Sequence, residues 1–240
     1  MKKGIILGIW AIVALASCKK DKKSPVTPAP SPTCNIVSFT EEVGGSTASG
    51  TITYNNDNKM STLVMGNTTK VFTYSGSNMT IMSTTGSVVT RDSCTVSSSG
   101  LLTYFGHFDN SGTFSYSNTY QYNAQGQLIQ SVYFNGTANT VTSYQWQNGD
   151  LVKATLGANV STYEYYTDKS AAPGDYLYVF QVLTYGGRFI NSQHLIKSVD
   201  PGGGSPVSNF TYTFDGSNIS KLVMTSGAQI VNFTYGYQCK

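Results

Sequence analysis

A repeated unit of two short strands is the feature that most constrains this chain. Residues 53–74 run from Thr-Tyr through a polar turn, an apolar segment and a second turn to Val-Phe-Thr-Tyr, and residues 213–235 repeat that order. β-Branched, aromatic and apolar residues punctuated by Asn, Asp, Ser and Gly form the pattern of a β-hairpin. A chain that repeats such a unit along its length builds its fold from neighbouring copies. The sequence therefore predicts an all-β fold, an antiparallel meander of repeated hairpins.

Further copies of the unit lie between these two. Clear copies begin at Tyr120 and Tyr144, and weaker copies begin at Cys94 and Tyr163. The position that is usually aromatic in each unit falls at residues 54, 74, 96, 122, 146, 165, 214 and 235. We expect the meander to form a curved open sheet or a half-barrel.

The unit Tyr-x-Tyr-Asn-x-x-Gly-x-Leu at residues 120–128 resembles the Tyr-Asp (YD) type repeats of bacterial surface and toxin-shell proteins. It resembles more closely the repeats of a group of uncharacterised bacterial lipoproteins. The resemblance covers most of residues 50–240. Because the motif specifies a hairpin, the resemblance implies a fold and no particular activity.

One interval between aromatic positions, Tyr165 to Phe214, is about two periods long and indicates an insertion at about 170–206. It contains an apolar run at 175–185 and a Pro- and Gly-rich loop at 201–206. A segment that is apolar on every face is buried. Two interpretations of 175–185 stay open: one short helix lying against the sheet, or two further strands.

The N-terminus has the pattern of an exported and lipid-anchored protein. Lys2 and Lys3 precede an apolar segment at 4–14, which is shorter than the roughly 20 residues of a membrane-spanning helix. The following Leu-Ala-Ser-Cys resembles the lipobox of bacterial lipoproteins, and this resemblance implies lipid attachment at Cys18. We expect residues 1–17 to be a signal peptide.

Residues 18–33 are rich in lysine and proline and predict an extended tether, followed by a single β-repeat domain at 34–240. Lys19 follows Cys18, where an Asp would resemble an inner-membrane retention signal. The predicted location is the cell envelope, with the outer membrane favoured and with the lipid as the contact to the membrane. The domain contains 9 basic and 11 acidic residues, so its charge gives no indication of nucleic-acid binding.

Three cysteines remain after Cys18, so at most one disulfide forms within the chain. Cys34 and Cys239 bracket the domain, and they are the candidate pair. A bond between them would close a very long loop and add roughly 4–5 kcal/mol of stability. Cys94 takes the place of an aromatic residue in its unit and is expected to be a buried thiol.

The sequence contains no recognisable catalytic, metal or cofactor motif. Only two histidines occur, His107 and His194, and His107 lies two residues from Asp109, on the same face of a strand. The carboxylates of Glu41 and Glu42 would point to opposite faces and cannot act together. We therefore expect a protein that is not an enzyme, with no catalytic residues, cofactor or metal ion.

Aromatic residues two apart in a strand share a face, and four of them are candidate ligand-binding residues: Tyr122, Tyr144, Trp146 and Tyr165. The same side chains could form the core. Three functions follow. The first is a binding or scaffolding module that uses one face of the sheet to hold a polysaccharide or an envelope protein. The alternatives are a carrier of a lipid or other apolar ligand in a half-barrel trough, and a hydrolase with an unrecognised site.

Overall fold

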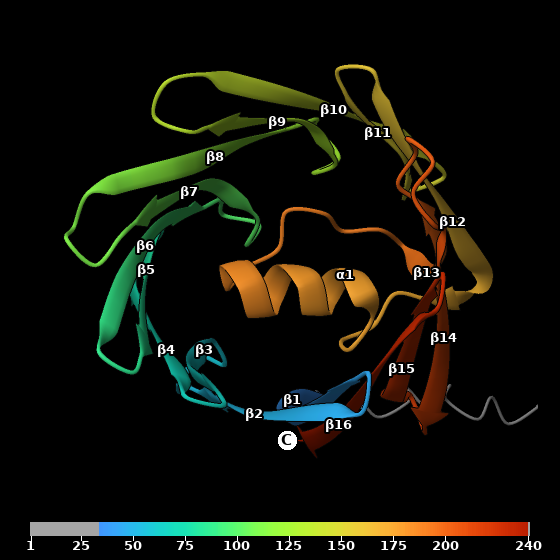
Figure 1. The fold of residues 1–240 in the computed structure, drawn as a ribbon, viewed down its shortest axis with the longest axis horizontal. Helices are drawn as coiled ribbons and strands as arrows, with labels where there is room; N and C mark the ends of the chain where they lie inside the picture. The colour runs from blue at the N-terminus through green and yellow to red at the C-terminus, as the bar shows by residue number, and fades with distance from the viewer. Residues whose placement is uncertain (1–33, 240) are drawn as a thin grey trace, which may run out of the picture. The chain divides into compact units, whose positions relative to one another are not determined.

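The computed structural model describes residues 34–239, which form one closed β-barrel (Figure 1). Sixteen antiparallel strands follow one another around the barrel in chain order, and β16 returns to pair with β1. The bounds of the strands are β1 (Cys34–Val43), β2 (Ser46–Tyr54), β3 (Met60–Met65), β4 (Thr68–Ser75), β5 (Asn78–Thr85), β6 (Val88–Val96), β7 (Leu102–Phe108), β8 (Phe114–Tyr122), β9 (Leu128–Phe134), β10 (Asn139–Gln147), β11 (Asp150–Leu156), β12 (Asn159–Ser170), β13 (His194–Asp200), β14 (Ser208–Asp215), β15 (Asn218–Ser226) and β16 (Gln229–Cys239).

The predicted antiparallel meander is confirmed, and the predicted open sheet or half-barrel is wrong. β1 and β16 pair from Cys34↔Cys239 to Val43↔Val231, so the first and last strands of the meander do not remain as edges. Closure removes unpaired N–H and C=O groups that an open sheet would present to another chain. We call the β1–β16 pairing the seam of the barrel. A disulfide joins Cys34 to Cys239 at the end of this seam, across 205 residues of sequence.

Side chains alternate between the two surfaces of the barrel. On β2 and β4, Ile52 and Phe72 are buried inside, while Thr51, Thr53 and Thr73 are exposed outside. The buried apolar side chains of the other strands join the same interior cluster. The barrel is therefore apolar within, and its outer surface combines threonine and serine with exposed apolar side chains such as Val71.

Six aromatic side chains form a repeated contact inside the barrel, which we name the aromatic collar. Each donates its hydroxyl or indole N–H to the backbone carbonyl of a buried apolar residue 14–20 positions earlier in the chain. The donors and acceptors are Tyr54 to Ile36, Tyr74 to Met60, Tyr122 to Leu102, Trp146 to Leu128, Tyr212 to Ile196, and Tyr237 to Ile219. The collar explains the aromatic positions 54, 74, 122 and 146: the ring packs on the core, and the polar tip ties one hairpin to the one before. In the last units the donors are Tyr212 and Tyr237, each two residues from the expected positions 214 and 235.

The turns at the collar end use side chains that satisfy their own backbone. Oδ1 of Asn55 accepts the N–H groups of Asp57 and Lys59, and Oδ1 of Asn123 does the same for Gln125 and Gln127. These Asx turns explain why Asn recurs directly after the aromatic residue. They fix the hairpins that the repeat predicts.

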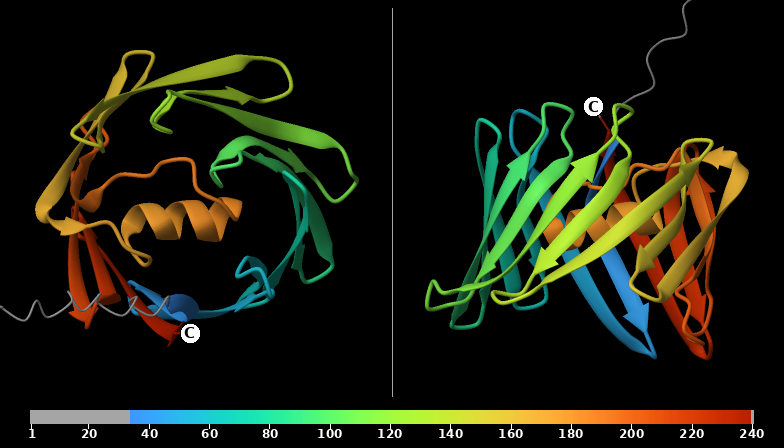
Figure 2. Two further views of the ribbon diagram at one scale, coloured as in Figure 1. Left: turned by 180° about the vertical axis from the view of Figure 1, so that it is seen from behind. Right: turned by 90° about the horizontal axis from the view of Figure 1, so that it is seen from above.

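The insertion enters the barrel as a helix (Figure 2). It consists of α1 (Tyr176–Tyr178) and a π-helical continuation, η1 (Val179–Leu183), with Asp175 accepting the N–H of Tyr178 at its start. The short helix expected at 175–185 is thus confirmed, and the alternative of two further strands is wrong. The periodicity could not decide between them, because a helix inside a barrel is contacted on most sides and is apolar on most sides.

The predicted signal peptide, the lipid-attachment residue Cys18 and the tether lie outside the described residues. Within residues 34–239, no helix has the length and hydropathy that crossing a membrane requires.

Candidate ligand-binding cavity

A cavity of about 530 Å³ lies between the internal helix and one wall of the barrel. Strands β10, β11 and β12 form the wall, and the loop after β13 reaches it from the side. The lining residues are Thr142, Tyr144, Ala154, Leu156, Asn159, Ser161, Tyr163, Phe180, Phe189, Ile190, Pro201, Gly202, Gly203 and Ser205.

The cavity is bounded by aromatic and apolar surfaces. Phe180 projects from the helix and is 43% exposed although the helix lies inside the barrel. Tyr144 and Tyr163 contribute from the wall, and Phe189 packs against Tyr120 with ring centroids 4.8 Å apart. The ring of Phe180 contacts those of Tyr176 and Tyr185, with centroids 6.2 and 5.9 Å away. The part of the ring that remains exposed is apolar surface that a ligand would remove from water.

None of the lining side chains carries a charge at neutral pH. Burial raises the pKa of Tyr163 to about 12 and also raises the pKa of Tyr144, so both phenols stay protonated. Thr142, Asn159 and Ser161 supply neutral hydrogen-bonding groups, and Ser161 Oγ donates to the carbonyl of Pro201 at 3.2 Å. The cavity suits a neutral, largely apolar molecule with a few polar groups.

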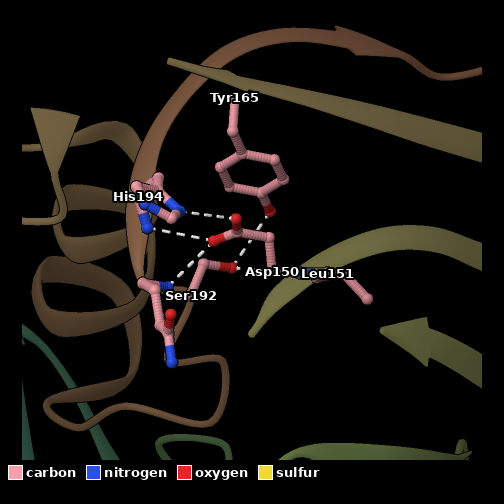
Figure 3. A network of polar contacts seen from close by, with 6 residues as sticks. Asp150, Leu151, Tyr165, Ser192 and His194 are labelled. Atoms are coloured by element: carbon pink, nitrogen blue, oxygen red, sulfur yellow. Dashed lines mark hydrogen bonds and ion pairs between the residues drawn. The ribbon is translucent and has the colours of Figure 1, made fainter. Parts of the chain in front are cut away.

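A buried polar network fixes the return of the insertion to the barrel (Figure 3). Asp150 accepts the backbone N–H groups of Gln193 and His194, each at 2.9 Å, and its other oxygen contacts His194 Nδ1 at 2.7 Å. Ser192 Oγ is 3.0 Å from the hydroxyl of Tyr165 and accepts the N–H of Leu151. The network contains Ser, His and Asp, yet no hydrogen bond joins Ser192 to His194 in the described part of the chain. Its geometry supports a structural role, since the Ser-to-His step of a hydrolytic triad is missing.

His107 pairs with a residue that the sequence did not suggest. Its Nδ1 lies 2.6 Å from Oδ1 of Asp92 on the neighbouring strand, and its ring stacks on Tyr116 at 5.0 Å. The suggested neighbour Asp109 instead accepts the N–H groups of its own turn. Asp92 is buried, and burial raises its pKa while His107 and Lys70 oppose that shift.

The four candidate ligand-binding residues lie in three different parts of the structure. Tyr144 lines the cavity, whereas Tyr122 and Trp146 belong to the aromatic collar and Tyr165 belongs to the network of Asp150. Sequence reasoning missed Phe180, which lies in the apolar run at 175–185, and therefore missed the floor of the cavity. The sequence showed that Phe180 belongs to an apolar segment, but only the position of the helix in the barrel places its ring at the cavity.

Among residues 34–239 there is no group of three or more His, Cys, Asp or Glu side chains arranged to hold a metal ion. Cys94 is a free, buried thiol, and burial raises its pKa to about 12.

Comparisons with known proteins identify the fold. No protein-family profile matches the sequence, and no curated protein is similar to it at a significant level. A porin-like protein from Bacteroides uniformis ATCC 8492 superposes with a TM-score of 0.63 and 14% identity, covering 85% of this chain and 98% of that chain. A porin-like protein from Bacteroides vulgatus ATCC 8482 gives a TM-score of 0.58 and 13% identity with the same coverage. The chain shares the barrel fold of these porin-like proteins.

Proposed function

We propose that this protein is a non-enzymatic barrel of the cell envelope that holds an apolar or amphipathic small molecule in its interior. The observation that carries the proposal is the uncharged cavity of about 530 Å³ with Phe180 exposed in it. Its volume lies in the range of small-molecule sites, and its lining combines apolar surface with a few polar groups, as such sites do. This is the carrier function that the sequence left open, in a closed barrel rather than a trough.

The sidedness of the barrel supports a ligand inside over a pore through a bilayer. A membrane-spanning barrel has an outward apolar band about 25 Å tall and commonly a polar interior. Here Ile52 and Phe72 face inward, and an apolar helix occupies the interior. The outward side chains include both threonines, such as Thr51, and exposed apolar residues, such as Val71. The porin-like neighbours thus supply the fold, and the apolar, helix-filled interior favours a bound ligand over an aqueous channel.

The test fills the cavity from its wall. Ala154→Phe places a ring in the cavity, because Ala154 lies opposite Tyr144 and Ser161, which both line it. Thr155→Phe is the matched control, since the next residue of a strand faces the other surface. Binding of the apolar fluorophore N-phenyl-1-naphthylamine is measured by titration of each purified protein.

We expect the unaltered protein and Thr155→Phe to bind the fluorophore alike, and Ala154→Phe to bind at least tenfold more weakly. Equal binding by a folded Ala154→Phe protein, or no binding by the unaltered one, would contradict an interior site. Native mass spectrometry of protein purified from its host then identifies the natural occupant.

A second candidate function, docking of an envelope protein on the outer face, is favoured by one cluster of outward side chains. The ring of Phe114 contacts those of Phe108 and Phe134, with centroids 5.8 and 6.0 Å away. The guanidinium of Arg91 lies 4.4 Å from the ring centroid of Phe108. Replacing Phe114 with Ser should release such a partner without changing binding of the fluorophore. Loss of fluorophore binding in that variant would instead show that the cluster supports the barrel.

A further inference from the structure

A second, smaller pocket lies within the insertion itself, and we name it the insertion pocket. It measures about 160 Å³ and is lined by the segment that follows β12, by the helix, and by residues 188–193, which lead back to β13. Ala171, just beyond the last residue of β12, lines the insertion pocket, whereas Asn159, the first residue of β12, lines the first cavity. The two therefore lie toward opposite ends of the barrel.

The insertion pocket has a buried carboxyl group in its wall and an exposed guanidinium at its rim. Asp175 is 7% exposed, whereas Arg188 is exposed and its guanidinium lies 5.1 Å from the ring centroid of Tyr178. Both charged side chains line the pocket, yet neither takes part in an ion pair within residues 34–239. A buried carboxylate without a cation in contact is costly, and a positively charged ligand group would offset that cost.

Both groups are charged at neutral pH. Burial raises the pKa of Asp175 to about 6, while the N–H of Tyr178 and the guanidinium of Arg188 oppose that shift. The carboxyl is thus mostly ionised at neutral pH, and an arginine side chain is effectively always protonated. The pocket therefore presents one charge of each sign to a small ligand.

The walls of the insertion pocket are fixed by a buried amide. Gln181 is 1% exposed, and its Nε2 donates to the carbonyls of Leu177 and Ile190 at 2.9 and 3.1 Å. Its Oε1 accepts the N–H groups of Phe189 and Ile190 at 2.7 and 2.6 Å. These four bonds tie the returning segment to the helix. A pocket that is ordered in this way loses little conformational entropy when a ligand binds.

We propose that the insertion pocket binds a small α-amino acid, whose ammonium group contacts the carboxylate of Asp175 and whose carboxylate pairs with the guanidinium of Arg188. The planar fork of a guanidinium matches a carboxylate in two parallel hydrogen bonds. The volume limits the side chain of the ligand: a cavity of about 150 Å³ accommodates benzene, and alanine is about as large as benzene. This site is independent of the apolar ligand proposed for the first cavity.

The test removes each charge separately. L-Alanine is titrated by calorimetry into the unaltered protein, Asp175→Asn and Arg188→Gln. Asparagine is a favourable residue at the start of a helix, so Asp175→Asn keeps the turn while it removes the charge. Arg91→Gln is the matched control, since it removes a guanidinium that lies over Phe108 on the outer surface. Propionate and ethylamine, which each carry one of the two charges, measure the two halves of the site.

We expect one equivalent of alanine to bind the unaltered protein and Arg91→Gln alike, and to bind each pocket variant at least tenfold more weakly. Propionate, ethylamine and the larger amino acid tryptophan should each bind the unaltered protein at least tenfold more weakly than alanine. Absence of alanine binding to the unaltered protein, or unchanged binding to Arg188→Gln, would overturn the proposal. If Asp175→Asn does not fold, Arg188→Gln decides the question, because its side chain is exposed.

Ala154→Phe separates the insertion pocket from the first cavity. This variant should bind alanine as the unaltered protein does, and Arg188→Gln should bind N-phenyl-1-naphthylamine as the unaltered protein does. Loss of alanine binding in folded Ala154→Phe would place the amino acid in the first cavity and refute the insertion pocket. The two proposals thus fail independently, since each has its own probe and its own variant.

Discussion

Trp146 offers the sharpest test of the collar, because its ring and its polar tip can be removed separately. Its indole packs against the interior cluster opposite Leu151, and Nε1 donates to the carbonyl of Leu128 at 2.7 Å. Leu128 and Leu151 are both 0% exposed. Trp146→Ala therefore opens a cavity against side chains that are otherwise fully packed.

The magnitude follows from these two contacts. Replacing a buried tryptophan by alanine costs about 3–5 kcal/mol, and one hydrogen bond contributes about 1 kcal/mol. Because Trp146 is only partly buried, we expect Trp146→Ala to lower the free energy of unfolding by about 3 kcal/mol, near the lower end of that range. Trp146→Phe retains most of the apolar contact and should cost about 1–2 kcal/mol.

Urea unfolding followed by circular dichroism measures both variants without relying on tryptophan fluorescence. Gln145→Ala is the control, since Gln145 is exposed on the outer surface and should change stability by no more than about 0.5 kcal/mol. A loss of unfolding free energy below about 1 kcal/mol for Trp146→Ala would be well short of the value expected for a buried tryptophan. It would show that the indole is not part of the core. It would also remove the physical basis of the collar.

The remaining predictions concern the seam, the buried acids and the anchor. Cys239→Ser should lower the free energy of unfolding by up to about 5 kcal/mol, because the disulfide with Cys34 closes a loop across 205 residues. An unchanged midpoint of urea unfolding would show that strand pairing alone holds the seam. Asp150→Ala should lower the free energy of unfolding by at least about 3 kcal/mol, since it leaves two backbone N–H groups and His194 without their acceptor. A loss below about 1 kcal/mol in urea unfolding would contradict this expectation. Burial raises the pKa of Asp175 to about 6, so the folded protein holds this proton more tightly than the unfolded chain, and stability should fall by roughly 2 kcal/mol as the pH rises from 4 to 6. Asp175→Asn should abolish that part of the pH dependence in thermal unfolding, and parallel profiles for the two proteins would refute it. Cys18→Ala should prevent labelling by a palmitate analogue and release the protein from membranes, and a variant that is still labelled would exclude the predicted attachment site.

The hairpins were predictable because their determinants are local. Alternation at Ile52 and Thr53, and the turn residue Asn55 directly after Tyr54, depend on neighbours within a few positions. The same locality explains why the aromatic repeat could be found in the sequence. It did not show what the aromatics do, because the carbonyl acceptor of Tyr54 lies 18 residues earlier and on another strand.

The tertiary structure alone decided closure, the place of the helix and the candidate site. Whether the meander remains open depends on pairing between Cys34–Val43 and Gln229–Cys239, two segments at opposite ends of the domain, and no local pattern encodes that pairing. The apolar composition of residues 175–185 predicted that this segment is buried. Only the surrounding barrel determined that the segment is a helix in the barrel interior and that Phe180 remains exposed to a cavity. Sequence thus determined the repeated element, which short-range patterning specifies, while the cavities arise from contacts between residues far apart in the chain.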